Sequence, residues 1–261
     1  MRICIISTTV FPIPLQGYGG LEQLCYHLAE GLAKKGHQVS IVCPEGSRFI
    51  EKVEPIFCGL REEEEKAWAR YRGRLEKQEW EVIVDTSWQR WATMSSAGQD
   101  PQLPIVNWFH SHESIYRQQP PVRFGMWVGV SRSHAENMSR AWGVPAKFVY
   151  NGIDLDFYKA NGRPRGERYL WLGRYTTEKD PASIIALAQK LRIGVDFYGD
   201  VEIIGDQSYR NLCFNRADGY FAKVNPGISR EATVDAYSTH KGFLYFPAWE
   251  EMFGLTVVEA M

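Results

Sequence analysis

The first 43 residues follow the order strand, glycine-rich loop, helix, strand, and this order restricts the fold more than any other feature of the chain. The apolar run Ile3–Ser7 is typical of a buried parallel strand. Behind the loop, Leu24, Leu28 and Leu32 recur every four positions, which predicts a helix with one buried face. A second apolar run at Val39–Val42 completes a βαβ unit. Because such units join parallel strands by a right-handed crossover, we expect a parallel sheet here.

A second unit of the same kind lies further along the chain. It begins with a predicted strand at Tyr169–Leu172 and continues through a helix at Pro181–Leu191 to a strand at Gly194–Tyr198. The polar, turn-rich segment 161–166 precedes it and predicts an interdomain linker. We therefore expect an α/β protein of two doubly wound, Rossmann-like domains. Their predicted bounds are 1–162 and 163–261.

Further strands and helices alternate between and after these two units. Strands are predicted at Val53–Cys58, Val82–Asp85, Ile105–Phe109, Met126–Val130, Phe148–Tyr150, Tyr220–Lys223 and Gly242–Phe246. Helices are predicted at Glu62–Lys77, Ser133–Ala141 and Ser229–Ser238. This alternation is what an α/β sheet requires.

Bulk charge and hydropathy exclude several classes of protein. The net charge is -1, which argues against a nucleic-acid binder held by overall electrostatics. No uninterrupted apolar run approaches the roughly 20 residues of a membrane span, and the N-terminus lacks the apolar core of a secretory leader. We expect a cytoplasmic protein without a transmembrane segment.

Cysteine spacing predicts free thiols. The five cysteines are dispersed without a C-x-x-C pair, which argues against a disulfide framework and against a zinc site. They are Cys4, Cys25, Cys43, Cys58 and Cys213. We expect them to be buried and free, and we find no D-x-D or clustered His/Asp set that would predict another metal site.

The loop after the first strand is the first candidate site, because ligands of open parallel sheets lie beyond the carboxyl ends of strands. Gly19 and Gly20 allow a backbone to approach a phosphate or a sugar, and the helix behind them offers free N–H groups. The loop is not G-x-G-x-x-G, and no acidic residue follows on the second strand, which argues against a dinucleotide site. A plain tight turn is the alternative.

Two other strand ends carry residues suited to chemistry. His110, with His112 close by, can exchange a proton near neutral pH, although a loop histidine with a structural bond fits as well. Arg174 and Lys179 follow Gly173 and suit a diphosphate. Arg can bind two oxygens and Lys supplies a point charge. Taken alone, the two cations fit solvated surface charges equally well.

The segment Glu251–Glu259 follows the predicted strand Gly242–Phe246. We expect Glu251 in the loop and Glu259 in the first turns of a helix, with Gly254 permitting close approach of a ligand. Two carboxylates so placed can accept hydrogen bonds from several hydroxyls, as sugars and riboses require. A pair of glutamates is weak support by itself.

Together these segments resemble family 4 glycosyltransferases, a large retaining group with the GT-B fold. Gly19-Gly20-Leu21-Glu22 is similar to that family's N-terminal signature, and the Phe253-Gly254-Leu255 core between two glutamates resembles its E-x7-E motif. Other matching positions are Gly36-His37-Gln38-Val39, His110, Val130-Ser131, Asn151-Gly152-Ile153-Asp154, Leu172-Gly173-Arg174, Lys179 and Glu259-Ala260-Met261. The resemblance runs through the chain in order and implies two domains facing a cleft.

The resemblance implies transfer of a hexosyl group from a UDP- or GDP-sugar, with retention of anomeric configuration and with no cofactor or metal. The catalytic residues would be Arg174, Lys179, Glu251 and His110. The donor-binding residues would be Gly19, Gly20, Gly173, Met252, Phe253, Gly254, Leu255 and Glu259. Tyr18, Glu22 and Asn151 would lie on the acceptor side, together with the loop Ser111–Val122. The acceptor itself stays unknown.

The chain departs from the family pattern at Met261, inside the helix of Glu259, where family members continue. We expect either a part of a longer protein or a short chain completed by a partner. If no strand follows, Gly242–Phe246 becomes an exposed edge that is available for self-association. Peripheral membrane association also stays open.

Two alternatives to an active transferase remain. The first is a catalytically impaired protein that binds nucleotide sugars or assists assembly. The second is a GT-B epimerase or phosphorylase, although a phosphorylase would need a much longer chain and a lysine carrying a cofactor.

Overall fold

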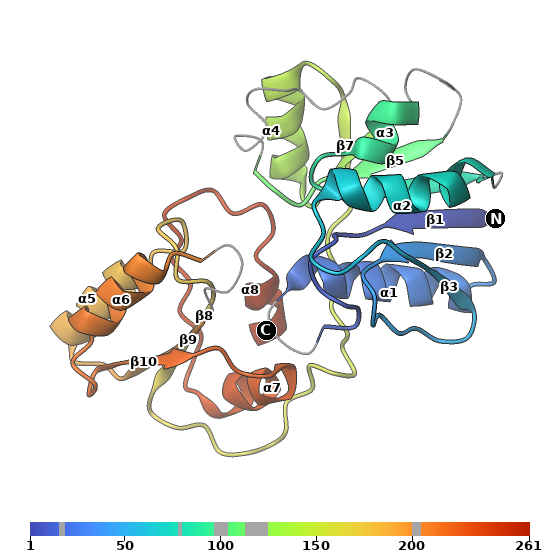
Figure 1. The fold of residues 1–261 in the computed structure, drawn as a ribbon. Coiled ribbons are helices and arrows are strands. Elements are labelled where there is room, and N and C mark those ends of the chain that lie inside the picture. Colours follow the sequence, from blue (N-terminus) through green and yellow to red (C-terminus); the bar gives the residue numbers. More distant parts are fainter. Residues whose placement is uncertain (16–18, 78–79, 97–103, 113–124, 200–204) are drawn as a thin grey trace. The chain divides into compact units, whose positions relative to one another are not determined.

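The computed structural model describes residues 1–15, 19–77, 80–96, 104–112, 125–199 and 205–261 (Figure 1). The chain divides into two compact units, and the division falls between Gly152 and Ile153, ahead of the predicted boundary at 162. The segment expected to be a linker bonds to the second unit. Asn161 Nδ2 donates to Asp235 at 2.9 Å, and Gly166 N donates to the carbonyl of Thr239 at 2.7 Å.

In the first unit, seven strands of the described residues form one parallel sheet in the order β3-β2-β1-β4-β5-β6-β7. They are β1 (Arg2–Ile6), β2 (Gln38–Cys43), β3 (Val53–Phe57), β4 (Val82–Asp85), β5 (Ile105–Trp108), β6 (Met126–Gly129) and β7 (Ala146–Phe148). Ile3 in β1 pairs with Val39 in β2 and with Val82 in β4. The strand order reverses between β1 and β4, so the sheet is doubly wound, as predicted.

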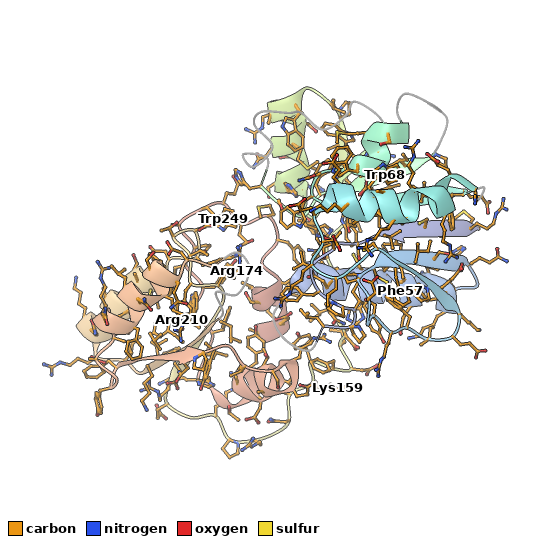
Figure 2. All side chains as sticks on the ribbon, in the orientation of Figure 1. Phe57, Trp68, Lys159, Arg174, Arg210 and Trp249 are labelled. Carbon is orange, nitrogen blue, oxygen red and sulfur yellow. The ribbon has the colours of Figure 1, made fainter. Side chains whose placement is uncertain are left out.

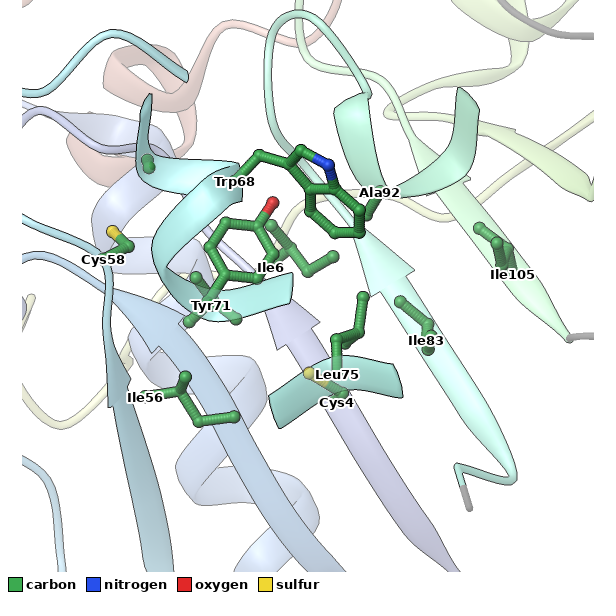
Figure 3. Close-up of a cluster of buried hydrophobic side chains, with 12 residues drawn as sticks. Cys4, Ile6, Ile56, Cys58, Trp68, Tyr71, Leu75, Ile83, Ala92 and Ile105 are labelled. Atoms are coloured by element: carbon green, nitrogen blue, oxygen red, sulfur yellow. The ribbon is translucent and has the colours of Figure 1, made fainter. Parts of the chain in front are cut away.

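Helices cover both faces of this sheet. Side chains of β1 alternate between the two faces, and because they are apolar on both, each face needs a helix to bury them. Ile3 and Ile5 pack with α1 (Gly20–Lys34) in one buried cluster. Cys4 and Ile6 belong to the opposite cluster, which Trp68 covers from α2 (Glu64–Lys77), beside α3 (Trp91–Ser96) (Figure 3). The fourth helix, α4 (Arg132–Trp142), packs against β6 and β7.

The second unit repeats the plan on a smaller sheet. Three strands of its described residues run parallel in the order β10-β9-β8, with bounds Ala222–Pro226, Val195–Gly199 and Tyr169–Leu172. The helices are α5 (Pro181–Leu191), α6 (Gln207–Arg216), α7 (Arg230–Thr239) and α8 (Leu255–Ala260). Trp171 and Phe197 face a cluster built by α5 and α6, whereas Leu170 and Leu172 pack against Ala236 of α7.

Capping side chains begin four of the helices in the described residues, α4 to α7. Ser131 accepts from the N–H of His134 at the start of α4, and Asp180 accepts from Ser183 N at the start of α5. Pro181 follows Asp180 at the first helical position, where its missing N–H costs nothing. Ser229 caps α7 in the same way, so that this helix begins at Arg230, one residue after its predicted start.

The predicted strand Gly242–Phe246 is wrong, because only Phe243 forms an isolated parallel bridge, to Leu170. Leu170 N donates to Gly242 O at 2.9 Å, and Leu244 N donates to Leu170 O at 2.8 Å. Pairing then stops. Further on, Ala248 N donates to the carbonyl of Glu178, so the chain turns to the loop before α5 instead of extending the ladder. The segment 242–246 thus has the apolar side chains typical of a strand, but beyond the bridge at Phe243 its backbone does not pair with the sheet.

Smaller differences concern element bounds. The last strand of the first sheet, β7, ends at Phe148, where the predicted strand Phe148–Tyr150 begins, because Ala146–Phe148 take the register opposite Trp127–Gly129. Helices α3 and α6 were not predicted. The first has six residues, and in the second Cys213 alone is buried, so neither gives a clear apolar repeat.

All five cysteines are free and buried, as predicted. Burial raises the pKa of the Cys25 thiol to about 12, so this side chain packs as a small apolar group. Within the described part of the chain, no helix is long and apolar enough to cross a membrane.

Asp196 of β9 accepts two charged hydrogen bonds in the second unit. Arg168 Nε donates to its Oδ2 at 2.8 Å, and His240 Nε2 lies 3.2 Å from the same oxygen. Burial alone would raise the pKa of Asp196, but the bonds from His240 and Arg168 outweigh it and lower this pKa to about 2. The bond to Asp196 raises the pKa of His240 above its ordinary value.

We predict that His240→Gln loses more stability near pH 5.5 than near pH 9. A raised folded-state pKa means that the contribution of His240 is fully present below about pH 6.5 and is lost as the pH rises through that pKa. The Asp196 contribution has the opposite sign: it is present above about pH 4 and is lost as the pH falls toward 2. Thermal unfolding of both proteins from pH 5 to 9 measures the difference, and a gap that stays constant would contradict it.

Candidate functional site

The first unit places its candidate residues at the carboxyl edge of the sheet, where the strand order reverses between β1 and β4. Glu22, in the first turn of α1, is buried, and its Oε1 accepts the hydroxyl of Thr8 at 2.6 Å. Burial raises the pKa of Glu22, and the Thr8 bond opposes that effect. A carboxylate at a sheet's switch point is well placed for a polar ligand.

Gly19 precedes α1 and adopts a positive φ. Its φ is 154°, and a Cβ there would lie 2.2 Å from the side chain of Leu15 and 2.8 Å from Oε2 of Glu22. Gly20 begins α1 and is exposed. The positive φ therefore favours glycine at position 19, whereas the two close atoms are ends of flexible side chains that can move aside. Tyr18, also predicted for the site, and most of the loop Ser111–Val122 lie outside the described residues.

His110 follows β5 at the same edge. Its Nε2 is buried and, among the described residues, has no hydrogen-bond partner. Burial lowers the pKa of His110 well below its ordinary value, and the nearby charge of Arg90 lowers it further. The imidazole is thus neutral at physiological pH, and it contacts the ring of Trp108 at 4.3 Å between centroids.

A buried polar network beside His110 was missed by the sequence analysis. Asp85 ends β4 and is completely buried, and its Oδ1 accepts from the backbone N and the hydroxyl of Ser87. Its Oδ2 accepts from Thr93 at 2.7 Å, and Thr93 also bonds Asn107 of β5 at 2.9 Å. Asp85 is the last residue of the predicted strand Val82–Asp85, and an acidic residue at the carboxyl end of an apolar strand is the sequence signal for this network.

In the second unit, Gly173 begins the loop that carries the two predicted cations. Thr176 N donates to Arg174 O at 2.9 Å, and the carbonyl of Thr176 accepts from Lys179 and Asp180. These turns fix the loop between β8 and α5. Arg174 is half-buried, and its charge acts on Lys179 by lowering that residue's pKa. Figure 2 marks Arg174 on this unit.

Lys179 and Glu251 form an ion pair in which 14% and 17% of the two side chains are exposed. Glu251 Oε2 accepts from Lys179 Nζ and from the hydroxyl of Tyr245. Trp249 Nε1 donates to the same oxygen at 3.3 Å (Trp249 is marked in Figure 2). The ammonium also lies 5.3 Å from the Trp249 ring and 5.7 Å from the Tyr245 ring. The sequence predicted both charges, but neither aromatic partner.

Both charges of this pair persist at neutral pH. Burial would raise the pKa of Glu251, but the charge of Lys179 and the bonds it receives outweigh burial and lower this pKa. Burial also lowers the pKa of Lys179, and the carboxylate of Glu251 opposes that effect. A buried ion pair is costly to break, because removing one partner leaves the other charge without compensation.

Glu259 lies on α8, as predicted, and accepts from the hydroxyl of Tyr237 on α7 at 3.1 Å. Burial raises its pKa, with bonds from Tyr158 and Tyr237 acting the other way. Gly254 caps α8 at φ 79°, a left-handed conformation that favours glycine. The half-buried neighbours of this cap are Met252, Phe253 and Leu255.

Asn151 closes the first unit, and its Oδ1 is buried without a partner among the described residues. The structure gives it no neighbour that assigns a role. The described residues contain no group of three His, Cys, Asp or Glu side chains placed to hold a metal.

The sequence profile described as Glycosyltransferase Family 4 matches residues 18–157, which is more than half of the chain. The chain belongs to this family. A comparison with curated protein sequences gives no match.

Several solved glycosyltransferases have a similar fold. AviGT4, involved in avilamycin A biosynthesis, has a TM-score of 0.76 at 18% identity, over 99% of this chain and 75% of that one. A glycosyltransferase from Rickettsia africae has a TM-score of 0.71 at 13% identity, over 99% and 76%. The catalytic domain of starch synthase IV from Arabidopsis thaliana, bound to ADP and acarbose, has a TM-score of 0.70 at 12% identity, over 99% and 80%. At these identities the likeness shows the fold, which is the α/β architecture of GT-B glycosyltransferases.

We predict that Gly199→Ala destabilises the second unit by roughly 2 kcal/mol, through overpacking against backbone. A Cβ at this position would lie 2.2 Å from Gly173 O and 2.8 Å from the Tyr175 ring, so the loop carrying Arg174 has to shift. The control is Gly31→Ala in α1, where a Cβ meets nothing within 4 Å. The higher helix propensity of alanine should raise the free energy of unfolding of this variant by roughly 0.5–1 kcal/mol. Urea denaturation measures both; equal stabilities of Gly199→Ala and the unaltered protein would refute the clash.

Proposed function

We propose that the protein transfers a hexosyl group from a UDP- or GDP-sugar to an acceptor hydroxyl, with retention of configuration and without a metal or cofactor. Glu251 carries the proposal. Lys179, Tyr245 and Trp249 all donate to its Oε2, and no described residue donates to its Oε1. An acceptor oxygen that is fixed in place and left free is what recognition of a sugar hydroxyl needs.

Arg174 and Lys179 are proposed to stabilise the departing diphosphate. Cations held in a fixed loop favour the transition state, because they need no reorganisation as negative charge develops on the leaving group. Arg174 can bind two phosphate oxygens at once, while Lys179 stays oriented by its pair with Glu251. The bond between the anomeric carbon and the diphosphate oxygen breaks with its electrons on that oxygen. The acceptor oxygen bonds the same carbon, and its proton goes to the diphosphate.

The remaining roles extend from this centre. Glu259 is proposed to accept from the ribose, and the backbone at Gly254 to hold sugar and phosphate. In the first unit, Gly19 and Gly20 are proposed to approach the donor phosphate, and His110 to line the reaction centre. Gly173, Met252, Phe253 and Leu255 complete the proposed donor site, and Tyr18, Glu22 and Asn151 the acceptor side. Free, buried cysteines fit the proposed cytoplasmic location.

We predict that a UDP- or GDP-sugar raises the unfolding temperature, since ligands that bind only the folded state stabilise it. Glu251→Gln and Arg174→Ala are each expected to lower turnover at least ~100-fold, because each removes a fixed contact to charge or hydroxyls in the transition state. The measurements are thermal shift against a panel of UDP-, GDP- and ADP-sugars, followed by release of nucleoside diphosphate with candidate acceptors.

Arg163→Ala is the matched control, because this exposed arginine of the second unit pairs with Asp235 on the surface. It should turn over at the normal rate. Normal turnover in Glu251→Gln and Arg174→Ala would refute the assigned roles. Stabilisation by a nucleotide sugar without release of nucleoside diphosphate would favour the alternative of a binding or assembly protein.

A further inference from the structure

The chain leaves the first sheet at His110, and a buried arginine bonds the backbone just before it. Phe109 N donates to Val128 O at 2.9 Å, which continues the pairing of β5 with β6. Arg90 Nη2 donates to the carbonyl of Trp108 at 3.0 Å, and its guanidinium carbon lies 4.4 Å from the Phe109 ring centroid. Arg90 therefore holds both residues that precede His110.

The position of Arg90 is itself fixed from β4. Its Nη1 donates to the carbonyl of Asp85 and lies 3.5 Å from Asp85 Oδ1. Arg90 adopts φ 56°, a left-handed conformation that is rare and costs of order 1 kcal/mol or more for a residue with a Cβ. Such a conformation persists only where its surroundings hold it, here through the network around Asp85.

On the other side of His110, His134 of α4 bonds the next residue. Its Nδ1 accepts from Val130 N at 3.2 Å, so Nδ1 carries no proton. The proton of the neutral ring is on Nε2, which lies 3.1 Å from Ser111 O and donates to it. Gly129 makes room for this ring, because a Cβ there would lie 2.9 Å from Ala135 N and 3.3 Å from His134 Nδ1.

We propose that Arg90 and His134 are positioning residues that hold the backbone on both sides of His110, and so fix the orientation of its imidazole. The inference rests on the proposed function in that His110 lines the reaction centre. The geometry itself does not depend on that role: one side chain bonds residue 108, the other bonds residue 111, and both are buried.

His110 needs such support because its own ring is poorly tethered. Its Nε2 has no hydrogen-bond partner among the described residues, and its ring makes an edge contact with the ring of Trp108. The charge of Arg90, ahead of α3, acts on this ring and favours its neutral form. Misplacement of a reacting group by about 1 Å can cost roughly 100-fold in rate, so fixing the backbone fixes the chemistry.

Two substitutions at one position separate positioning from folding. His134→Asn retains an acceptor where Nδ1 bonds Val130 but has no donor that reaches Ser111. His134→Gln retains a donor at the place of Nε2. We expect His134→Asn to lower kcat at least ~10-fold with an unchanged donor KM, and His134→Gln to recover kcat to within about threefold. Lys66→Gln, an exposed residue of α2, is the surface control.

A second readout is independent of transferase activity. Histidine NMR of isotope-labelled protein, with His110 assigned through His110→Gln, should show the Nε2–H form of His134 and one His110 signal in the unaltered protein. The His110 signal should shift or split in His134→Asn and in Arg90→Lys, which replaces the two guanidinium nitrogens that bond Asp85 and Trp108 by a single nitrogen. If no donor supports turnover, the proposed function fails while these spectra still test the positioning.

Three results would overturn the inference. The first is an Nδ1–H form of His134 in the unaltered protein, which needs no variant to fold. The second is an unchanged His110 signal in both His134→Asn and Arg90→Lys. The third is a kcat for His134→Asn within twofold of the unaltered protein.

Discussion

All strand pairings described in the two sheets are parallel, and the rest of the molecule depends on this constraint. Parallel neighbours need a crossover over one face of the sheet, so each strand is followed by a loop at the same edge. Side chains that are far apart in the sequence therefore lie close together at this edge, although no local sequence pattern specifies a contact between them. Glu22 after β1, Asp85 at the end of β4 and His110 after β5 share one edge for this reason. Arg174, which follows β8, occupies the equivalent edge of the second sheet.

Burial decides what these edge residues can do. Lys179 and Glu251 keep their charges although they are largely shielded from water, because each compensates the other and because Tyr245 and Trp249 add bonds to one carboxylate oxygen. No described residue donates to the second oxygen, which is the one proposed to bind the donor sugar. His110 is treated in the opposite way: burial and nearby positive charge keep it neutral. One unit therefore offers fixed charges, and the other a neutral ring.

The supporting residues are of a different kind from the ones they support. Arg90 and His134 bond backbone carbonyls, and Asp85 accepts hydrogen bonds from the loop that follows it. All three side chains therefore bond other parts of the protein. Their polar atoms are buried and mostly paired, as buried groups must be. Arg90 and His134 carry no motif, because the role of each is defined by a partner that lies 18 or 23 positions away in the chain and is brought near by the sheet. For that reason the motif search found His110 and missed both of its neighbours.

The sequence by itself determined the two βαβ units, the parallel sheets, the family and the placement of Gly19, His110 and Arg174 after strands. Hydrophobic periodicity and glycine spacing are local signals, so they suffice for such conclusions. Only the tertiary structure decided that 242–246 forms a single bridge and that three donors meet on Glu251 Oε2. It also decided that the buried side chains of Arg90 and His134 bond the backbone on either side of His110. Strand pairing and side-chain burial depend on contacts between distant segments, whose energies no local pattern of residues records.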